Sequence, residues 1–445
     1  MANSPSHLSG DRLPGGRHLL RDKTVLCWAM YDWANSAYTT LLITVLVTYL
    51  QRVVFPTESW GHVGAVVWAW GISASMFLGA VLSPIVGAIA DARRCKRQLL
   101  AITALVGSVA SILLGVVPPR MYVIVVALFV VANLMLELSL GVYNGFLPEI
   151  VDDDQVNAAS AWGYGLGYLG GGIALLLAMG IIHFGDRLAL PTMTSRLQCS
   201  LILMGCWWGI FTLPAILVLR DNTADSPSDH TLSQAIRGSV GDVTKTLRDL
   251  RKHAAVALFL LSFLFYNDGV QTIISQASTF ALQELAFPEA ELMAVILMIQ
   301  FLALPGAIIV GWCADKFGQK GTLLTCLVVW AGVLVSALAV TNKLGFWLLA
   351  MVIAFVLGGT QSVSRSLMAT MIPKDKNAQY FGFFNLSGKA TSFLGTFLFG
   401  AIVAVTGSSR VAIFGLLPLF LIGAILLWFV QTSDRAANLR PKEHA

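Results

Sequence analysis

The sequence predicts an all-α integral membrane protein with twelve transmembrane helices in two six-helix pseudo-repeats. Three observations carry this prediction: an apolar composition, twelve long apolar runs, and a loop sequence that occurs twice. Of the 445 residues, 56% are hydrophobic and 12% are charged, and the mean hydropathy is +0.75. Soluble domains carry roughly 25% charged residues, so the composition excludes a soluble globular fold.

Twelve runs are long enough to cross a membrane, because about 20 apolar residues span the hydrocarbon core as a helix. The expected spans are 25–50, 62–90, 98–117, 121–146, 157–184, 197–219, 254–284, 290–314, 321–341, 345–369, 379–406 and 410–431. The polar stretch between the sixth and seventh spans divides the chain. The expected parts are a tail over 1–24, a six-helix bundle over 25–219, a central loop over 220–253, a second bundle over 254–431 and a tail over 432–445.

The distribution of Lys and Arg predicts the orientation of the chain. These residues lie mainly in the two tails and in every second loop. Cytoplasmic loops of membrane proteins are enriched in Lys and Arg, so both termini are predicted to be cytoplasmic. The same asymmetry accounts for the net charge of +5, and no nucleic-acid partner is expected.

The sequence predicts neither a metal nor a cofactor. The six cysteines show no C-x-x-C spacing and no cluster with histidine, so disulfide and metal sites are not expected. The stretch "GLGYLG", residues 165–170, matches the spacing of a dinucleotide-binding loop, but it lies inside an apolar run with no strand before it. Small residues in a membrane helix allow close helix packing. No phosphate-binding loop is found, which argues against ATP-driven transport.

A short loop sequence occurs once in each half of the chain. "GAIADARRCKR", residues 87–97, and "GWCADKFGQK", residues 311–320, both follow the second span of their half. Asp91 and Asp315 lie 224 residues apart, as do Gly87 and Gly311. Parallel six-helix halves are a known plan of secondary transporters, with the solute site at mid-membrane between the halves.

Both loops resemble the loop between the second and third spans of the major facilitator superfamily: Gly, three residues, Asp, a basic residue, any residue, Gly and further basic residues. The first copy departs from this pattern, with Ala92 at the first basic position and Arg94 at the glycine position. The resemblance implies an inner gate that the aspartates hold shut with basic residues and helix ends. A solvated basic loop that only sets topology is the alternative. The gating residues implied are Gly87, Asp91, Arg93, Arg94, Gly311, Asp315, Lys316, Gly318 and Lys320.

A narrower resemblance extends over nearly the whole chain. Six stretches in order are similar to the vacuole-effluxer branch of that superfamily, which joins fungal autophagy-linked amino-acid effluxers of the vacuole to bacterial permeases. This resemblance implies export of amino acids. The short tail and compact central loop favour a bacterial cytoplasmic membrane. The six stretches are "YDWANSAY" (31–38), "YNGFLPEI" (143–150), "WGYGLGYLGG" (162–171), "YNDGVQT" (266–272), "QSVSRSLMATMIP" (361–373) and "FFNLSGKATSFLG" (383–395).

Ionisable side chains inside the expected spans are the candidate transport residues. A charge at the bilayer centre costs on the order of 3 kcal/mol, and such residues usually serve a pathway or a partner. Positions three and four apart share a helix face, which gives a polar stripe on span 1 and another on span 7. The candidates for binding the solute or coupling a proton are Asp32, Asn35, Ser36, Glu137, Asn267, Asp268, Gln271, Gln361, Arg365 and Lys389.

This set of side chains suits a zwitterion such as an amino acid. Arg365, with Gln361 one turn away, would bind the solute carboxylate or lock a closed gate, since Arg can grip a carboxylate with two parallel hydrogen bonds. Asp268 or Asp32 would meet the amine or carry a coupling proton. Buried charges require partners, and Arg365 or Lys389 are the expected partners of Asp268. Purely structural salt bridges between helices are the alternative.

The function predicted from the sequence is secondary active transport, in the direction of efflux, of a small polar solute, with amino acids as the expected class. The expected partners are a small-molecule solute, membrane lipid and candidate coupling protons, and the expected state is a monomer. A drug or metabolite exporter of the same fold and a transport-dead receptor or scaffold are the alternatives. No pair of nucleophile and base stands out, so an enzyme is not expected.

Overall fold

The computed structural model describes residues 19, 21–60, 63–221, 254–285, 289–372, 376–389, 392–406 and 408–431. Within these ranges the chain is helical, and eleven helices are long and apolar enough to cross a membrane. The expected span 379–406 is supplied by α15 (Asn377–Lys389) and α16 (Ser392–Thr406), with residues 390–391 outside the described part. The tails 1–18 and 432–445, together with 222–253 of the central loop, also lie outside it.

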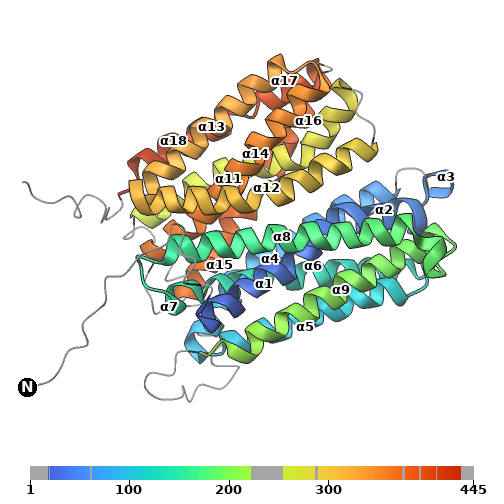
Figure 1. The fold of residues 1–445 in the computed structure, drawn as a ribbon, viewed down its shortest axis with the longest axis horizontal. Helices are drawn as coiled ribbons and strands as arrows, with labels where there is room; N and C mark the ends of the chain where they lie inside the picture. Colours follow the sequence, from blue (N-terminus) through green and yellow to red (C-terminus); the bar gives the residue numbers. More distant parts are fainter. Residues whose placement is uncertain are drawn as a thin grey trace, which may run out of the picture.

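The first half of the chain forms one bundle, which Figure 1 shows in blue to green. Its first span runs from Lys23 to Val54 and contains two π-helical stretches. The helices are α1 (Lys23–Leu41), η2 (Leu42–Leu46), α2 (Val47–Tyr49), η3 (Leu50–Val54), α3 (Thr57–Trp60), α4 (Val63–Arg93), α5 (Lys96–Val116), α6 (Tyr122–Asn144), α7 (Leu147–Ile150), α8 (Val156–His183), η4 (Gly185–Leu188) and α9 (Met193–Val218).

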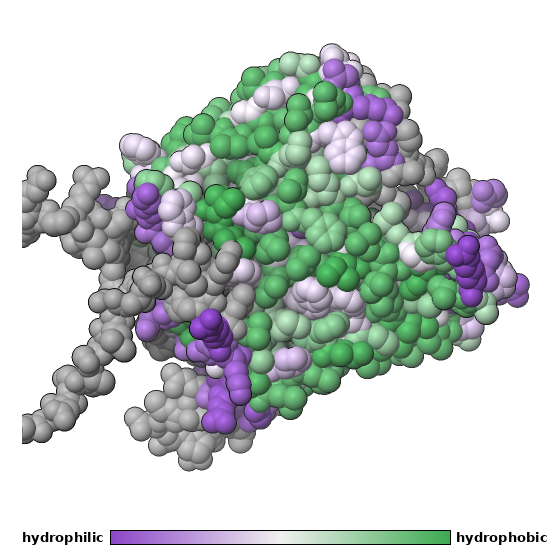
Figure 2. All heavy atoms as spheres, in the orientation of Figure 1, coloured by the Kyte–Doolittle hydropathy of each residue, from purple (hydrophilic) through white to green (hydrophobic). Residues whose placement is uncertain are grey.

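The second half forms a second bundle beside the first, in yellow to red. In addition to α15 and α16, its helices are α11 (Ala254–Glu284), α12 (Glu289–Phe317), α13 (Gln319–Ala339), α14 (Lys343–Met371), α17 (Ser409–Phe414) and α18 (Leu417–Phe429). Figure 2 shows a broad hydrophobic surface over both bundles, with hydrophilic residues gathered at the two ends of the helices. This is the surface expected of a membrane-embedded bundle, because lipid tails offer no partner to polar groups.

Both copies of the repeated loop lie at one end of the bundle, which we call the basic end, and both turn through a left-handed residue. Arg94 has φ 51° and Gly318 has φ 88°. The glycine pattern is broken in the first copy, and Arg94 has positive φ at the conformational cost that a side chain carries in this region. The two turns differ in length, because α13 begins directly after Gly318, whereas Cys95 separates Arg94 from the start of α5.

The two largest contacts between the halves are α4 with α15 and α8 with α12, and α14 also packs on α8 and α15 on α6. The repeated glycines lie at these contacts: a Cβ on Gly87 would come within 2.3 Å of the Ala378 carbonyl oxygen, and one on Gly311 within 2.7 Å of the Ala161 Cβ. Any larger residue would push the helices apart.

Asp91 connects the halves at the basic end. Its carboxylate accepts hydrogen bonds from the backbone N–H groups of Ala378 (3.2 Å) and Gln379 (2.9 Å), which lie in the first turn of α15. Such N–H groups lack partners within their own helix and carry partial positive charge. Lys96 lies 2.9 Å from Asp91 and also pairs with Glu149. The Asp91 side chain is only 6% exposed, so this contact is enclosed in the closed basic end.

The second copy of the loop makes different contacts. Asp315 is exposed and accepts a hydrogen bond from the Asn157 side chain on α8 (2.9 Å). Lys316 lies over the ring of Trp312, and Lys320 donates to the carbonyl of Val430 beyond the end of α18 (2.8 Å). Of the other loop residues, Arg93 is exposed. The two copies thus share a position in the fold and differ in what holds them.

We expect Asp91→Asn to shift the protein toward conformers open at the basic end, because the variant loses the charge that binds the α15 N-terminus and Lys96. The measurement is thiol labelling of Ser83→Cys, a buried position on α4, in a background without the six native cysteines. Labelling should become faster with Asp91→Asn. The control is Asp186→Asn, which removes an exposed carboxylate paired with Arg196 and should leave labelling unchanged. Equal labelling rates in all three backgrounds would contradict the gate.

Candidate functional site

Arg365 on α14 and Asp32 on α1 form a buried ion pair between the two halves. The Arg365 Nη1 lies 2.8 Å from the Asp32 Oδ2, and the side chains are 1% and 7% exposed. The guanidinium also donates from Nε to the Ser160 hydroxyl (2.9 Å) and from Nη2 to the Ser160 carbonyl (2.8 Å) on α8. A weaker bond of 3.4 Å reaches the Asn144 side chain. The pair is therefore tied to three helices of the first half.

Three aromatic rings surround the Arg365 guanidinium. Its central carbon lies 4.0 Å from the ring centroid of Tyr164, 4.9 Å from that of Trp28 and 5.8 Å from that of Tyr143. The Tyr143 hydroxyl donates to the Asp32 Oδ2 at 2.8 Å, so one carboxylate oxygen serves both tyrosine and arginine. A cation over aromatic faces gains about 0.5 to 2 kcal/mol for each favourable contact, and more when water is excluded.

Close approach of α8 to α1 depends on Gly163. A Cβ at this position would lie 2.6 Å from the Arg365 Nη2, 2.7 Å from the Asp32 Oδ2 and 2.9 Å from Trp28. Glycine leaves room for the charged pair and for the indole. The glycine run that matched a dinucleotide pattern lies inside α8, where it serves helix packing.

Polar contacts continue along the interface from this pair. Gln361, one turn from Arg365 on α14, accepts a hydrogen bond from the Tyr168 hydroxyl on α8 (2.7 Å). Further along, the Gln300 side chain on α12 donates to Thr40 on α1 (2.7 Å). Of the α1 stripe, the Asn35 amide bonds the carbonyl of its own helix at Tyr31 (2.9 Å). Ser36 faces α8, since a Cβ on Gly167 would meet its hydroxyl at 2.7 Å.

The expected partnership of Asp268 with Arg365 is wrong. Arg365 pairs with Asp32 across the halves, while Asp268 on α11 lies inside the second half. The Asp268 Oδ2 accepts the backbone N–H of Gly395 in the first turn of α16 (2.8 Å). Charge complementarity alone suggested that Arg365 pairs with Asp268. The packing of α14 against α8 brings Arg365 close to Asp32 instead.

Asn267 and Asp268 bind backbone groups of both described parts of the eleventh span. The Asn267 amide donates to the Gly388 carbonyl of α15 (2.9 Å), and the Asp268 carboxylate accepts the Gly395 N–H of α16. These bonds connect α11 to α15 and to α16. Among the described residues, the Asp268 Oδ1 and the Thr272 hydroxyl are buried without a hydrogen-bond partner.

The remaining candidates do not line the charged pair. Glu137 is buried on α6 within the first half, where a Cβ on Gly79 of α4 would touch it at 2.7 Å. Gln271 lies on α11, one turn beyond Asn267. Lys389 ends α15, and its side chain lies outside the described ones. In the part of the chain that is described, no three His, Cys, Asp or Glu residues are grouped to hold a metal.

Several site residues were missing from the sequence-based set. They are the cage residues Trp28, Tyr143, Asn144, Ser160 and Tyr164 and the gate residues Lys96, Asn157 and Glu149. A signal existed for some of them, because "YNGFLPEI" contains Tyr143, Asn144 and Glu149 and "WGYGLGYLGG" contains Tyr164. In a span that is apolar on all faces, the sequence does not show which tyrosine faces a partner helix. Helical periodicity could therefore not identify these site residues.

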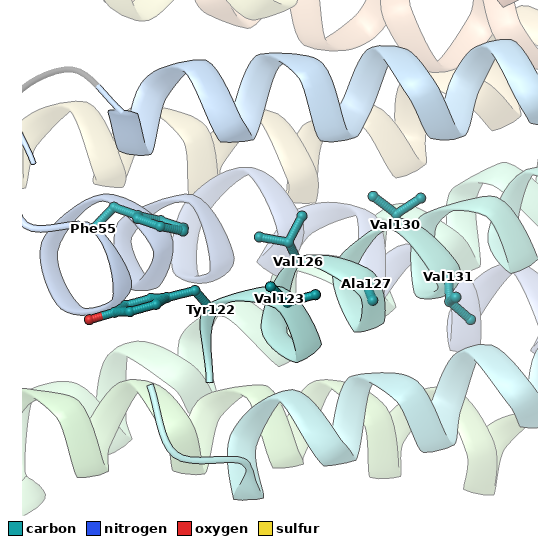
Figure 3. A pocket seen from close by; sticks show the side chains of 7 residues that line it. All are labelled: Phe55, Tyr122, Val123, Val126, Ala127, Val130 and Val131. Carbon is teal, nitrogen blue, oxygen red and sulfur yellow. The ribbon is translucent and has the colours of Figure 1, made fainter. Parts of the chain in front are cut away.

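An open groove on the first bundle is a poor site for a polar solute. It has a volume of about 560 Å³ and is lined by Phe55, after the end of the first span, and by Tyr122, Val123, Val126, Ala127, Val130 and Val131 of α6. Figure 3 shows these side chains, with the Tyr122 hydroxyl at one end of an otherwise apolar wall. The charged pair lies elsewhere, at the contact of α1, α8 and α14.

We expect Asp32 and Arg365 to be strongly coupled in stability, because breaking a buried pair by removing one partner typically costs about 3 to 5 kcal/mol. Asp32→Asn and Arg365→Gln should each lower the unfolding midpoint, and the double variant should lose less than the sum of the two. Thermal unfolding of the detergent-solubilised protein measures this. Asp186→Asn, at the exposed pair with Arg196, should change the midpoint little, since surface pairs contribute about 0 to 1 kcal/mol. Additive losses would show that the pair is not coupled.

The comparisons with known proteins agree with this architecture. The family model described as "Vacuole effluxer Atg22 like" matches residues 51–438. The chain is 30% identical over 410 residues to the "Uncharacterized MFS-type transporter YxiO" of Bacillus subtilis (strain 168), covering 91% of this chain and 94% of that protein. It is 24% identical over 355 residues to "Autophagy-related protein 22" of Kluyveromyces lactis, covering 74% and 71% of the two chains.

Solved structures show the same fold. The human organic anion transporter MFSD10 (TETRAN) matches with a TM-score of 0.71 at 12% identity, covering 91% of this chain and 99% of that one. The E. coli fucose:proton symporter FucP matches with a TM-score of 0.69 at 14% identity, covering 94% and 100%. The chain thus has the twelve-helix major facilitator fold, is a membrane transporter and not an enzyme, and belongs to the vacuole effluxer Atg22-like family.

Proposed function

We propose that this protein is a secondary active transporter that exports amino acids by alternating access. The observation that carries the proposal is the buried Asp32–Arg365 pair at the contact of the two halves. A zwitterion presents the same two charges, so its ammonium can meet Asp32 while its carboxylate meets Arg365. Arg binds carboxylates with geometric specificity. Exchange of an internal ion pair for a solute of matching charges keeps every buried charge compensated.

The location of this pair supports a role in the transport cycle. Asp32 lies nine residues into α1 and Arg365 six residues before the end of α14, which places the pair roughly 9 to 14 Å from the basic end at 1.5 Å per residue. Residues that join rigid halves lose their contacts when the halves rock, which is the expected motion of this architecture. Arg365 and Asp32 must therefore part when the basic end opens.

The basic end is, in this proposal, the cytoplasmic side of a bacterial cytoplasmic membrane. The enrichment of Lys and Arg in cytoplasmic loops supports this orientation, with both termini inside. The structure would then correspond to a conformer closed toward the cytoplasm. Membrane lipid surrounds the bundle, and a monomer contains the complete site.

Asp268 is the proposed carrier of a coupling proton. It is 1% exposed, it bonds one backbone N–H, and its second carboxylate oxygen has no hydrogen-bond partner in the described ranges. A buried carboxylate with an unused oxygen is a suitable place for a proton, because burial disfavours the charged form. Its hydrogen bond to Gly395 connects the proposed proton site to the eleventh span, whose α15 packs on α4 of the other half.

The test is counterflow in proteoliposomes with a panel of amino acids, with and without a pH gradient. Wild-type protein should exchange at least one amino acid, and Arg365→Gln should abolish exchange because the solute carboxylate loses its partner. Asp186→Asn is the control and should transport normally. Absence of exchange for every amino acid, with uptake of apolar drugs retained, would favour a drug exporter instead.

We expect Asp268→Asn to abolish concentrative transport while the protein remains folded, because an Asn carbonyl can still accept the Gly395 N–H but cannot carry a proton. The matched control is Asn267→Asp, which removes the donor to the Gly388 carbonyl and should lower the melting temperature. Counterflow by Asp268→Asn should persist if the residue carries only protons. Normal accumulation by a folded Asp268→Asn protein would refute the coupling role.

A further inference from the structure

We propose that the first half of the protein carries a receptor for a guanidinium group, which Arg365 occupies in this conformer and which the cationic side chain of a basic amino acid occupies when the halves separate. The inference rests on the proposed transport function and names the solute class. It predicts that basic amino acids are preferred over neutral ones.

All the groups that bind the Arg365 guanidinium belong to the other half of the protein. Within the described residues its hydrogen-bond acceptors are Asp32 on α1, Asn144 on α6 and Ser160 on α8. The three rings that face it belong to the same three helices. Arg365 is therefore an inserted ligand from the second half, and the receptor is complete without any residue of that half.

The receptor is held together by contacts that do not involve Arg365. Trp28 and Tyr143 stack with ring centroids 4.8 Å apart, and the Trp28 indole donates to the Tyr143 carbonyl (3.2 Å). The Tyr143 hydroxyl holds the Asp32 carboxylate at 2.8 Å, and α1 packs along α8. These bonds lie within one bundle and can persist when the second half moves away. The Ser160 hydroxyl also donates to the Ser362 carbonyl on α14 (2.7 Å), and this bond alone would be lost with Arg365.

The chemistry of the receptor selects a planar cation. Asp32 supplies a negative charge, Ser160 supplies a hydroxyl and a carbonyl oxygen to two different nitrogens, and Tyr164 lies 4.0 Å from the guanidinium carbon. A guanidinium offers five donors in a fixed plane and stacks on aromatic faces, whereas an ammonium is a compact, strongly hydrated charge. A neutral group of the same shape would leave the Asp32 charge uncompensated.

When Arg365 leaves the receptor, a cationic solute can take its place and favour the separated state of the halves. When the basic end opens, Asp32 loses its partner while three rings still flank the site, which is unfavourable for an incompletely hydrated charge. A solute guanidinium that enters the receptor restores the compensation and favours the separated state, since a ligand shifts an equilibrium toward the state that it binds more tightly. In a basic amino acid the side-chain cation thus takes the place at Asp32 that the α-ammonium takes in a neutral one, and the solute carboxylate remains free to meet Arg365.

The first experiment is chemical rescue of Arg365→Ala. This variant should melt at a lower temperature than the wild type, and millimolar methylguanidinium chloride should raise its melting temperature by several degrees while leaving the wild type unchanged. Urea, which is planar and neutral, should have no such effect. The double variant Asp32→Asn, Arg365→Ala should lose the rescue. The control Arg120→Ala, at an exposed position between α5 and α6, should not respond. A melting temperature of Arg365→Ala that methylguanidinium does not raise would overturn the proposal.

The second experiment keeps the proposal testable if Arg365→Ala fails to fold. Counterflow by wild-type protein is inhibited with arginine or with citrulline, its neutral isostere. The arginine concentration that gives half-inhibition should be lower than that of citrulline by a factor of about ten or more. A tenfold difference corresponds to about 1.4 kcal/mol of binding free energy. Equal inhibition by arginine and citrulline would refute the guanidinium receptor, but it would not contradict the proposed transport of amino acids. Rescue by methylguanidinium without exchange of any amino acid would instead retain the receptor and refute the proposed transport of amino acids.

Discussion

The rest of the structure depends on one electrostatic constraint: a guanidinium buried between two bundles must be compensated by the bundle that it does not belong to. Arg365 is 1% exposed, and its charge is met by Asp32 of the other half. An unpaired buried charge is costly, so separation of the halves requires water or a charged solute to replace the ion pair. The glycine at 163, which leaves room for both side chains, is a local consequence of this requirement.

A second theme is that side chains of neighbouring helices bind backbone groups of the eleventh span. Asp91 accepts N–H groups in the first turn of α15, and Asp268 accepts the Gly395 N–H of α16. Helix N-termini carry partial positive charge and free N–H groups, which Asp91 compensates at the start of α15. Asn267 donates to the Gly388 carbonyl. The eleventh span is therefore held by side chains from both bundles.

The internal repeat extends to the fold but not to the chemistry. Gly87 and Gly311 occupy equivalent positions where the halves meet, and the turns that follow share a left-handed residue. Asp91, however, is enclosed with Lys96, while Asp315 is exposed and bonds a neutral Asn157. The repeat therefore keeps the close glycine contacts between the halves, whereas each half has its own charges, which makes this end of the bundle asymmetric.

The sequence by itself determined the membrane-embedded helical fold, the positions of the spans, the repeat and the presence of Asp32 and Arg365 as buried charges, because apolar run length and the cost of charge in lipid are local properties. Tertiary structure alone decided which charges meet. The pairing of Arg365 with Asp32 instead of Asp268 depends on which face of α14 packs on α8, and helical periodicity does not encode the partner of a face. The aromatic cage has the same origin: its three rings come from three spans, and only the fold brings them together.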